Sequence, residues 1–211
     1  FSQAKQLSDG SWSASIIDVW DLKGPGYRRP FYGSRWWRSG ANGGGTPLIA
    51  GLIRPEEIEA GEIRHALLCA TPINRKATLY GDPSELCSPP ASRTDGYGYG
   101  VEYIPEGARI QLDPALDLDS LGLSEGSKTV AKAMQKYGMI VGDNSPTFKV
   151  YFQNLGPDAE LWIKYNYFQD LMNIPVEKFR VLKCNIVTKE MSDSETLKSW
   201  LGGQVYIEVI K

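Results

Sequence analysis

The sequence predicts a mainly β domain, a jelly-roll-like antiparallel sandwich with two or three short helices at its edges. Its 211 residues include 22 Gly and 13 Pro beside 6 Trp, 11 Tyr and 6 Phe, a mixture that suits short strands joined by tight turns. Residues 108–112 alternate apolar and polar side chains, as a half-buried strand does. We expect one β-rich domain over residues 1–187, followed by a C-terminal extension over residues 188–211.

Helix signals in this sequence are local. Pro55 stands at a first-turn position before two glutamates, and Gly61 is suited to end a short helix. Ser127 is the expected N-cap of a second helix that ends at Tyr137, and apolar residues at helical spacing indicate a third helix over 161–172. Strands are expected over residues 11–22, 63–70, 108–112, 139–141, 148–152, 179–187 and 204–210.

Composition excludes several classes of function. The net charge is −2 and no basic block occurs, which argues against nucleic acid as a partner. No apolar run approaches the length of a membrane span, about 20 residues. The motifs of nucleotide-binding loops, serine hydrolases and zinc enzymes are not found. An acidic run over 112–119 lacks the glycine and terminal glutamate of an EF-hand. We therefore expect neither a cofactor nor a metal.

The chain has three cysteines, Cys69, Cys87 and Cys184. A disulfide between Cys69 and Cys87 would close a short surface loop, which is plausible in an oxidising compartment. Cys184 would then be left for a partner on another segment or another chain. Three buried free thiols are the alternative, and the sequence does not decide between them.

Four residues are candidates for catalysis, His65, Arg93, Asp18 and Asp143, and we expect them to line one face. His65 is the only histidine, and an imidazole can act as acid or base near neutral pH. Two carboxylates can hydrolyse a glycosidic bond, whereas a tyrosine beside an arginine or histidine can remove a proton α to a uronic carboxylate. Both mechanisms stay open. So do the alternatives that His65 is a packed, hydrogen-bonded side chain and that Asp143 is a turn residue.

The candidate ligand-binding residues are Trp36 and Trp37 with the flanking Arg35 and Arg38, in a long loop rich in glycine and arginine. Tryptophan rings can stack on a sugar while a guanidinium grips an acidic group. The same residue types are enriched at protein–protein interfaces, and they also pack within a chain. These three interpretations stay open.

Several segments of the chain resemble a family of secreted, β-rich microbial proteins. The resemblance is carried by residues 51–54 (GLIR), 61–67 (GEIRHAL), 104–109 (IPEGAR) and 136–140 (KYGMI) with Asp143 and Asn144. It implies a β-rich fold and a secreted protein, and it brings no assigned catalytic residues. In related proteins a further β-rich segment precedes this region, and the chain begins at Phe1 rather than Met. We therefore expect that an N-terminal segment is missing.

These observations lead to two hypotheses about function. The first is an extracellular protein that binds polysaccharide, with cleavage by a lyase or glycosidase mechanism left open. The second is a non-enzymatic structural or assembly component of a cell surface or filament, in which the Arg/Trp loop is a contact surface. The expected partner is accordingly a polysaccharide or another protein chain.

Overall fold

A computed structural model of the chain describes residues 5–14, 42–76, 87–100, 102–156 and 160–182. The strands in chain order are β1 (Lys5–Gln6), β2 (Trp12–Ser13), β3 (Leu67–Thr71), β4 (Arg109–Leu112), β5 (Met139–Asn144), β6 (Lys149–Val150) and β7 (Phe179–Val181). The α-helices are α1 (Pro55–Glu59), α2 (Glu125–Lys136) and α3 (Glu160–Lys164). The 3-10 helices are η2 (Leu48–Ala50), η4 (Leu118–Leu121), η6 (Asn166–Asn173) and η7 (Val176–Lys178).

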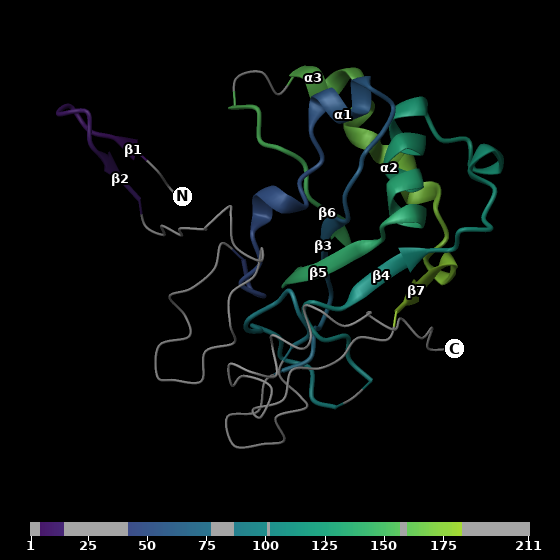
Figure 1. Ribbon diagram of the computed structural model, residues 1–211, viewed down its shortest axis with the longest axis horizontal. Helices are drawn as coiled ribbons and strands as arrows, with labels where there is room; N and C mark the ends of the chain where they lie inside the picture. Colours follow the sequence, from purple (N-terminus) through teal and green to yellow (C-terminus); the bar gives the residue numbers. More distant parts are fainter. Residues whose placement is uncertain (1–4, 15–41, 77–86, 101, 157–159, 183–211) are drawn as a thin grey trace, which may run out of the picture.

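The strands form two sheets (Figure 1). β1 and β2 make a two-stranded antiparallel sheet, and the other five strands make one sheet in the order β6-β3-β5-β4-β7. In the larger sheet β3 runs parallel to β5, with Leu67 opposite Met139, while the other neighbours are antiparallel. This parallel pair corrects the expectation of antiparallel strands throughout. Helices occupy about 29% and strands about 21% of the described part, so the mainly β class is confirmed only in part.

Helix α1 forms where its local signals place it. Pro55 occupies the first turn, and the side chain of Glu57 accepts a hydrogen bond of 3.0 Å from the backbone N–H of Arg54. The helix ends before Gly61, whose φ of 70° favours a residue without a side chain. The helix predicted from Pro55 and Gly61 is therefore confirmed.

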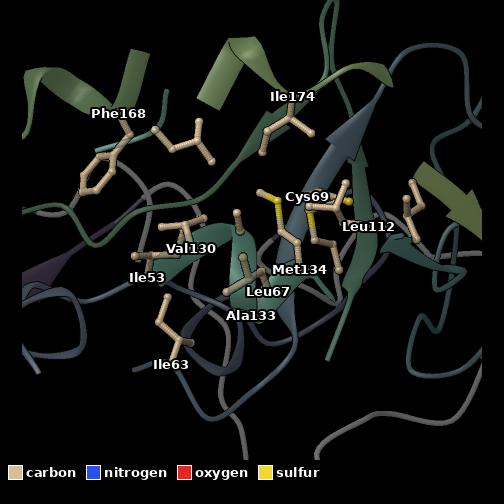
Figure 2. Close-up of a cluster of buried hydrophobic side chains, with 14 of the residues drawn as sticks. Ile53, Ile63, Leu67, Cys69, Leu112, Val130, Ala133, Met134, Phe168 and Ile174 are labelled. Atoms are coloured by element: carbon tan, nitrogen blue, oxygen red, sulfur yellow. The ribbon is translucent and has the colours of Figure 1, made fainter. Parts of the chain in front are cut away.

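Helix α2 covers one face of the larger sheet. Its N-cap is Ser124, whose hydroxyl accepts a hydrogen bond of 3.3 Å from the Ser127 N–H, so the predicted cap at Ser127 is three residues too late. Val130 and Met134 lie on the predicted apolar face and are buried. Figure 2 shows the side chain of Met134 among those of Leu67, Cys69 and Leu112, which come from β3 and β4.

The third predicted helix is broken into α3 and η6. Tyr167 and Phe168 at the break have φ values of 51° and 54°, a region that side chains rarely adopt. Phe168 is buried against Phe152, Trp162 and Tyr165, with ring centroids 4.7, 5.7 and 5.3 Å away. Aromatic packing therefore overrides the helical periodicity at this point. No helix within the described ranges is long and apolar enough to cross a membrane.

For Cys69 and Cys87 the structure shows the alternative of buried free thiols and not the possible disulfide. Cys69 and Cys87 are both free thiols and both buried. Cys69 belongs to the apolar cluster below α2, whereas the Cys87 thiol donates to the carbonyl oxygen of Ala91 at 3.3 Å. Burial raises the pKa of both thiols, which makes them poor nucleophiles. Cys184 and the boundary expected at residue 187 lie outside the described residues.

Two methionines provide a matched test of the core. Met134→Ala is expected to lower the free energy of unfolding by about 2–5 kcal/mol, because the side chain is 2% exposed and its removal leaves a cavity. Met172→Ala makes the same chemical change at a side chain that is 87% exposed, and we expect a change within about 0.5 kcal/mol. Urea denaturation of both variants measures the difference. Equal effects would contradict the placement of α2 on the sheet.

Candidate functional site

The candidate site lies at the carboxyl-terminal end of the parallel pair β3 and β5. Neighbouring parallel strands end at the same edge of a sheet, so the residues that follow Thr71 meet the end of β5 at Asp143. Asp95 and Glu106 reach the same edge from the chain between β3 and β4. One carboxyl oxygen from each of Asp95, Glu106 and Asp143 lies within 4.8 Å of the other two.

Glu106 is the buried centre of this acidic cluster, with no exposed surface. Its carboxyl group accepts hydrogen bonds of 3.2 Å from the side-chain amide of Asn74 and from the backbone N–H of Asp95. The pKa of Glu106 is raised to about 9, and burial is the largest cause. A hydrogen bond with Asp95 and electrostatic repulsion from Asp95 are the next causes. Glu106 is therefore a neutral carboxylic acid near pH 7, because a buried carboxylate without a cation is unfavourable.

Asn74 ties three segments of the chain together at the cluster. Its side-chain amide donates to Glu106 and to the backbone carbonyl of Asp143, the latter at 2.8 Å. Its side-chain oxygen accepts a hydrogen bond from the Thr71 hydroxyl. Its backbone N–H donates to the side-chain oxygen of Asn144 at 2.8 Å. Asn74 is fully buried, so these bonds replace the water that its polar atoms would otherwise contact.

Asp95 is the exposed member of the cluster. The side-chain amide of Asn144 donates to its carboxylate at 2.5 Å, which fixes its orientation. Gly43 packs directly against this carboxylate: a Cβ at Gly43 would lie 2.3 Å from one of the Asp95 oxygens. A side chain at position 43 would therefore displace Asp95.

Asp143 is half-buried between Asp95 and Tyr151. The Tyr151 hydroxyl donates to the Asp143 carboxylate at 3.3 Å. Burial and, next, repulsion from Asp95 raise the pKa of Asp143, and a hydrogen bond from the backbone of Gly43 partly opposes them. Burial also raises the pKa of Tyr151, with Asp143 as the second cause, so this phenol keeps its proton.

The arrangement supports two kinds of chemistry. Asp143 and Glu106 have raised pKa values and can hold protons close to Asp95, as acid–base pairs do. Three carboxyl groups at this spacing also offer the oxygen ligands that hard divalent cations prefer. A bound cation would favour the charged form of Glu106 and so would displace its proton.

Of the predicted catalytic residues, Arg93 and Asp143 contact the same short segment, which includes Asn42, Gly43 and Gly44. The guanidinium of Arg93 donates to the Asn42 carbonyl at 2.6 Å, and the backbone of Gly43 forms a hydrogen bond with the Asp143 carboxylate. Arg93 thus fastens the segment that borders Asp143. This is a positioning contact on the backbone.

His65 is not brought together with Asp143. Its Nε2 lies 3.0 Å from a carboxylate oxygen of Glu57 in α1, and its Nδ1 lies 2.9 Å from the carbonyl oxygen of Ala66. His65 precedes β3, while Asp143 pairs with Ala70, five positions farther along, which corresponds to roughly 16 Å of strand. The two side chains therefore lie at opposite ends of β3, and the expected common face is not formed by them.

The remaining predicted site residues lie outside the described part of the chain. They are Asp18, Trp36, Trp37, Arg35 and Arg38. Their predicted roles in catalysis and ligand binding stay predictions.

Sequence reasoning missed Glu106, Asn74 and Tyr151. Each is a single polar residue in a loop or beside a strand, and no local spacing connects them. Asn74 and Asp143, which are joined by a hydrogen bond, are 69 positions apart. The available signal was the segment 104–109, in which a glutamate stands between proline and glycine directly before a strand.

No protein-family model, curated protein or solved structure matches this chain. The interpretation of the site therefore depends on its own geometry.

Glu106→Gln is expected to remove a pH dependence of stability. The pKa of Glu106 is raised from 4.5 to about 9, so between these values the folded protein holds a proton that the unfolded chain has lost. Stability from this group is fully present below the unfolded pKa and is lost as the pH rises towards 9. The slope is at most about 1.4 kcal/mol per pH unit.

Urea denaturation across this pH range measures the slope for wild type and variant. Glu102→Gln makes the same change at an exposed glutamate and is expected to keep the wild-type slope. If Glu106→Gln and wild type lost stability equally with rising pH, the buried, protonated state of Glu106 would be contradicted.

Proposed function

We propose that the protein binds polysaccharide outside the cell and cleaves it at Asp95 and Asp143. The observation that carries this proposal is a row of three exposed side chains, Asp95, Tyr97 and Tyr99, directly beside the acidic cluster. Tyr97 is 58% exposed and Tyr99 is 68% exposed. Aromatic side chains that are exposed side by side, rather than singly, are typical of a binding surface.

The row is held by the residues that alternate with it. The Thr94 hydroxyl donates to the Arg75 carbonyl at 2.9 Å, and the Gly98 N–H donates to the Asn74 carbonyl at 2.9 Å. A Cβ at Gly96 would lie 2.1 Å from the Arg75 carbonyl oxygen, so the backbone approaches closely there. Exposure alternates along this segment, since Asp95, Tyr97 and Tyr99 are exposed whereas Thr94 and Gly98 are buried. Asp95 and the two tyrosines therefore face outward together.

Such a row suits a sugar chain. Tyrosine rings offer flat apolar faces for the C–H side of a sugar ring, with a hydroxyl for hydrogen bonding at the edge. A carboxylate accepts hydrogen bonds from sugar hydroxyls. Lys76 supports the outer ring, since its ammonium group lies 4.5 Å from the ring centroid of Tyr99. A ligand bound along Tyr99 and Tyr97 would end at Asp95, beside Asp143.

The same placement supports hydrolysis. In the proposed reaction Asp143 is the general acid, since its pKa is raised, and it protonates the glycosidic oxygen. Asp95 attacks the anomeric carbon as the glycosidic C–O bond breaks and the protonated leaving sugar departs, which forms a glycosyl ester on Asp95. Asp143 then takes a proton from water, and the water oxygen attacks the anomeric carbon and frees Asp95. A carboxyl oxygen of Asp95 and one of Asp143 lie within 4.8 Å of each other. The two catalytic carboxyl groups are about 5–5.5 Å apart in retaining glycosidases and about 6.5–9.5 Å apart in inverting ones, so the distance here agrees better with a retaining enzyme.

The lyase mechanism has less support at this site. It needs a tyrosine or histidine that takes a proton from the sugar. The pKa of Tyr151 is raised, so its phenol keeps its proton and cannot accept one from the sugar, and His65 lies at the other end of β3. We therefore propose the glycosidase form of cleavage.

The proposal includes an extracellular location and the finer fold class. The location rests on the expectation from the sequence that the protein is secreted. A jelly-roll-like sandwich would require a second sheet against the larger one, and strands outside the described residues would have to supply it. Within the described residues α2 covers one face of that sheet.

A second candidate function is that of an assembly component. It is favoured by large apolar side chains exposed on the segment from α3 to η7, namely Ile163, Tyr167, Met172 and Val176, which are 53%, 57%, 87% and 77% exposed. Exposed apolar residues grouped along one segment are typical of a surface that another chain covers. In this function the acidic cluster would be structural.

The double substitution Tyr97→Ala, Tyr99→Ala is expected to weaken polysaccharide binding at least tenfold, because stacking on an aromatic ring contributes roughly 0.5–1.5 kcal/mol per ring beyond its buried area. Affinity electrophoresis against neutral and acidic polysaccharides, followed by calorimetry, measures the change.

Tyr167→Ala is the control for this experiment, since Tyr167 is 57% exposed on a different segment. Binding that survives the double substitution would contradict the role of the row. If wild type bound no polysaccharide, and if it formed oligomers that Met172→Glu dissolved in sedimentation experiments, the assembly function would be favoured.

Asp95→Asn and Asp143→Asn are each expected to reduce the release of new reducing ends by about a hundredfold or more, because each removes one partner of the acid–nucleophile pair. Asp119→Asn, at an exposed carboxylate, and His65→Ala are expected to keep wild-type activity. A product that absorbs in the ultraviolet would instead indicate a lyase. If only His65→Ala lost activity, the proposed roles of Asp95 and Asp143 would be contradicted and His65 would be the catalytic residue.

A further inference from the structure

A cavity of about 420 Å³ lies on the surface of α2, away from the acidic cluster. It is lined by the segment Gly61, Glu62 and Ile63 that precedes β3, by Pro114 after β4, and by the helix residues Thr129, Lys132, Ala133, Gln135 and Lys136. Sites for small ligands are commonly about 300–1,000 Å³. The cavity is thus large enough for a sugar unit.

The floor and walls of this cavity are fixed by packing and hydrogen bonds. Ile63 and Ala133 are buried apolar residues of the floor, and beside them the Thr129 hydroxyl donates to the Glu125 carbonyl oxygen at 2.9 Å. The side-chain amide of Gln135 donates to the carbonyl oxygens of Asp113 and Leu116 at 2.8 and 2.9 Å. These two hydrogen bonds hold the loop that contains Pro114 against α2. The cavity is therefore preformed, which lowers the entropy lost on binding.

The lysines on the exposed side of α2 differ in whether they form ion pairs. On the same helix Lys128 forms ion pairs with Asp119 and Glu125, at 2.7 and 3.1 Å. Lys132 and Lys136, by contrast, are exposed and form no ion pair with the described residues.

Glu62, the acidic residue at the rim, already pairs with Arg64 at 2.8 Å. The rim thus carries two lysines one turn apart, in a chain whose net charge is −2. Residues four apart on a helix are neighbours, with Cβ atoms about 5–6 Å apart. The Lys136 ammonium lies 5.1 Å from the ring centroid of Tyr137, and rotation of this exposed side chain would bring it to the Lys132 ammonium at the rim.

We infer that this cavity binds the carboxylate of a uronic acid unit in an acidic polysaccharide, as a second binding site remote from Asp95. The inference rests on the proposed function for the nature of the ligand. Lys132 and Lys136 grip the carboxylate, while Ile63 and Ala133 contact the apolar face of the sugar ring. The site gives the protein a preference for acidic over neutral chains, and it adds to the affinity of any chain long enough to reach both sites.

The test compares the double variant Lys132→Gln, Lys136→Gln with wild type. Glutamine keeps a long side chain and a good helix propensity, so α2 is expected to form, and circular dichroism checks it. Calorimetry measures binding of an oligogalacturonide and of a neutral cello-oligosaccharide of the same length. The dissociation constant for the oligogalacturonide should rise about tenfold in the variant, because two charge-assisted hydrogen bonds are lost, while that for the neutral ligand stays unchanged.

The control is Lys164→Gln, Lys178→Gln, which removes the same charge from exposed lysines elsewhere and should keep wild-type affinities. Oligogalacturonide binding that is equal in wild type and in the Lys132, Lys136 variant would overturn the inference and leave the proposed function standing. Equal losses in both double variants would also overturn it, since they would indicate a general charge effect. Wild type that bound neither oligosaccharide would overturn the proposed function as well.

Discussion

The parallel pairing of β3 with β5 is the constraint on which the rest of the structure depends. Antiparallel neighbours place the end of one strand beside the start of the next, whereas parallel neighbours end together. Here the pairing of Ala70 with Asp143 brings the chain after β3 to the end of β5. Asn74 can then bond to the backbone of Asp143, and the polar side chains gather at that edge. Helix α2 covers the sheet below them and keeps this pairing out of water.

The acidic cluster persists because its buried member is neutral. A charged Glu106 with no exposed surface would be strongly unfavourable, and protonation together with the bond from Asn74 avoids this. The proton has a further effect, because Glu106 then repels Asp95 less. Asp95 can stay beside Asp143 at a distance that three full charges would not tolerate. The geometry of the Asp95–Asp143 pair thus depends on the protonation of the buried Glu106.

The sequence predicted those elements whose signals are local. Pro55 and Gly61 bound α1 closely, and the alternation over 108–112 identified β4. The partner of β3 could not be predicted, since pairing depends on contacts across the whole chain. The same limit explains why the sequence left a Cys69–Cys87 disulfide and buried free thiols as equal alternatives. Cys69 and Cys87 are near in sequence, but β3 directs Cys69 to the apolar core, while Cys87 contacts its own loop.

The sequence contains only part of the signal for the row of Asp95, Tyr97 and Tyr99 beside the acidic cluster. Residues 94–99 alternate small and large side chains, as a strand does, but glycine at two inward positions gives the composition of a loop. The contacts of Gly96 and Gly98 explain those glycines, because the backbone lies against the carbonyls of Asn74 and Arg75 and the ring of Tyr103.

Asn74 therefore joins the acidic cluster to the row of Asp95, Tyr97 and Tyr99. Its side chain satisfies Glu106, and its backbone carbonyl holds Gly98 and with it the outward tyrosines. Any displacement of this residue would move the aromatic row and the carboxyl pair together. This mechanical link is a physical reason to treat the row and the acidic cluster as a single site.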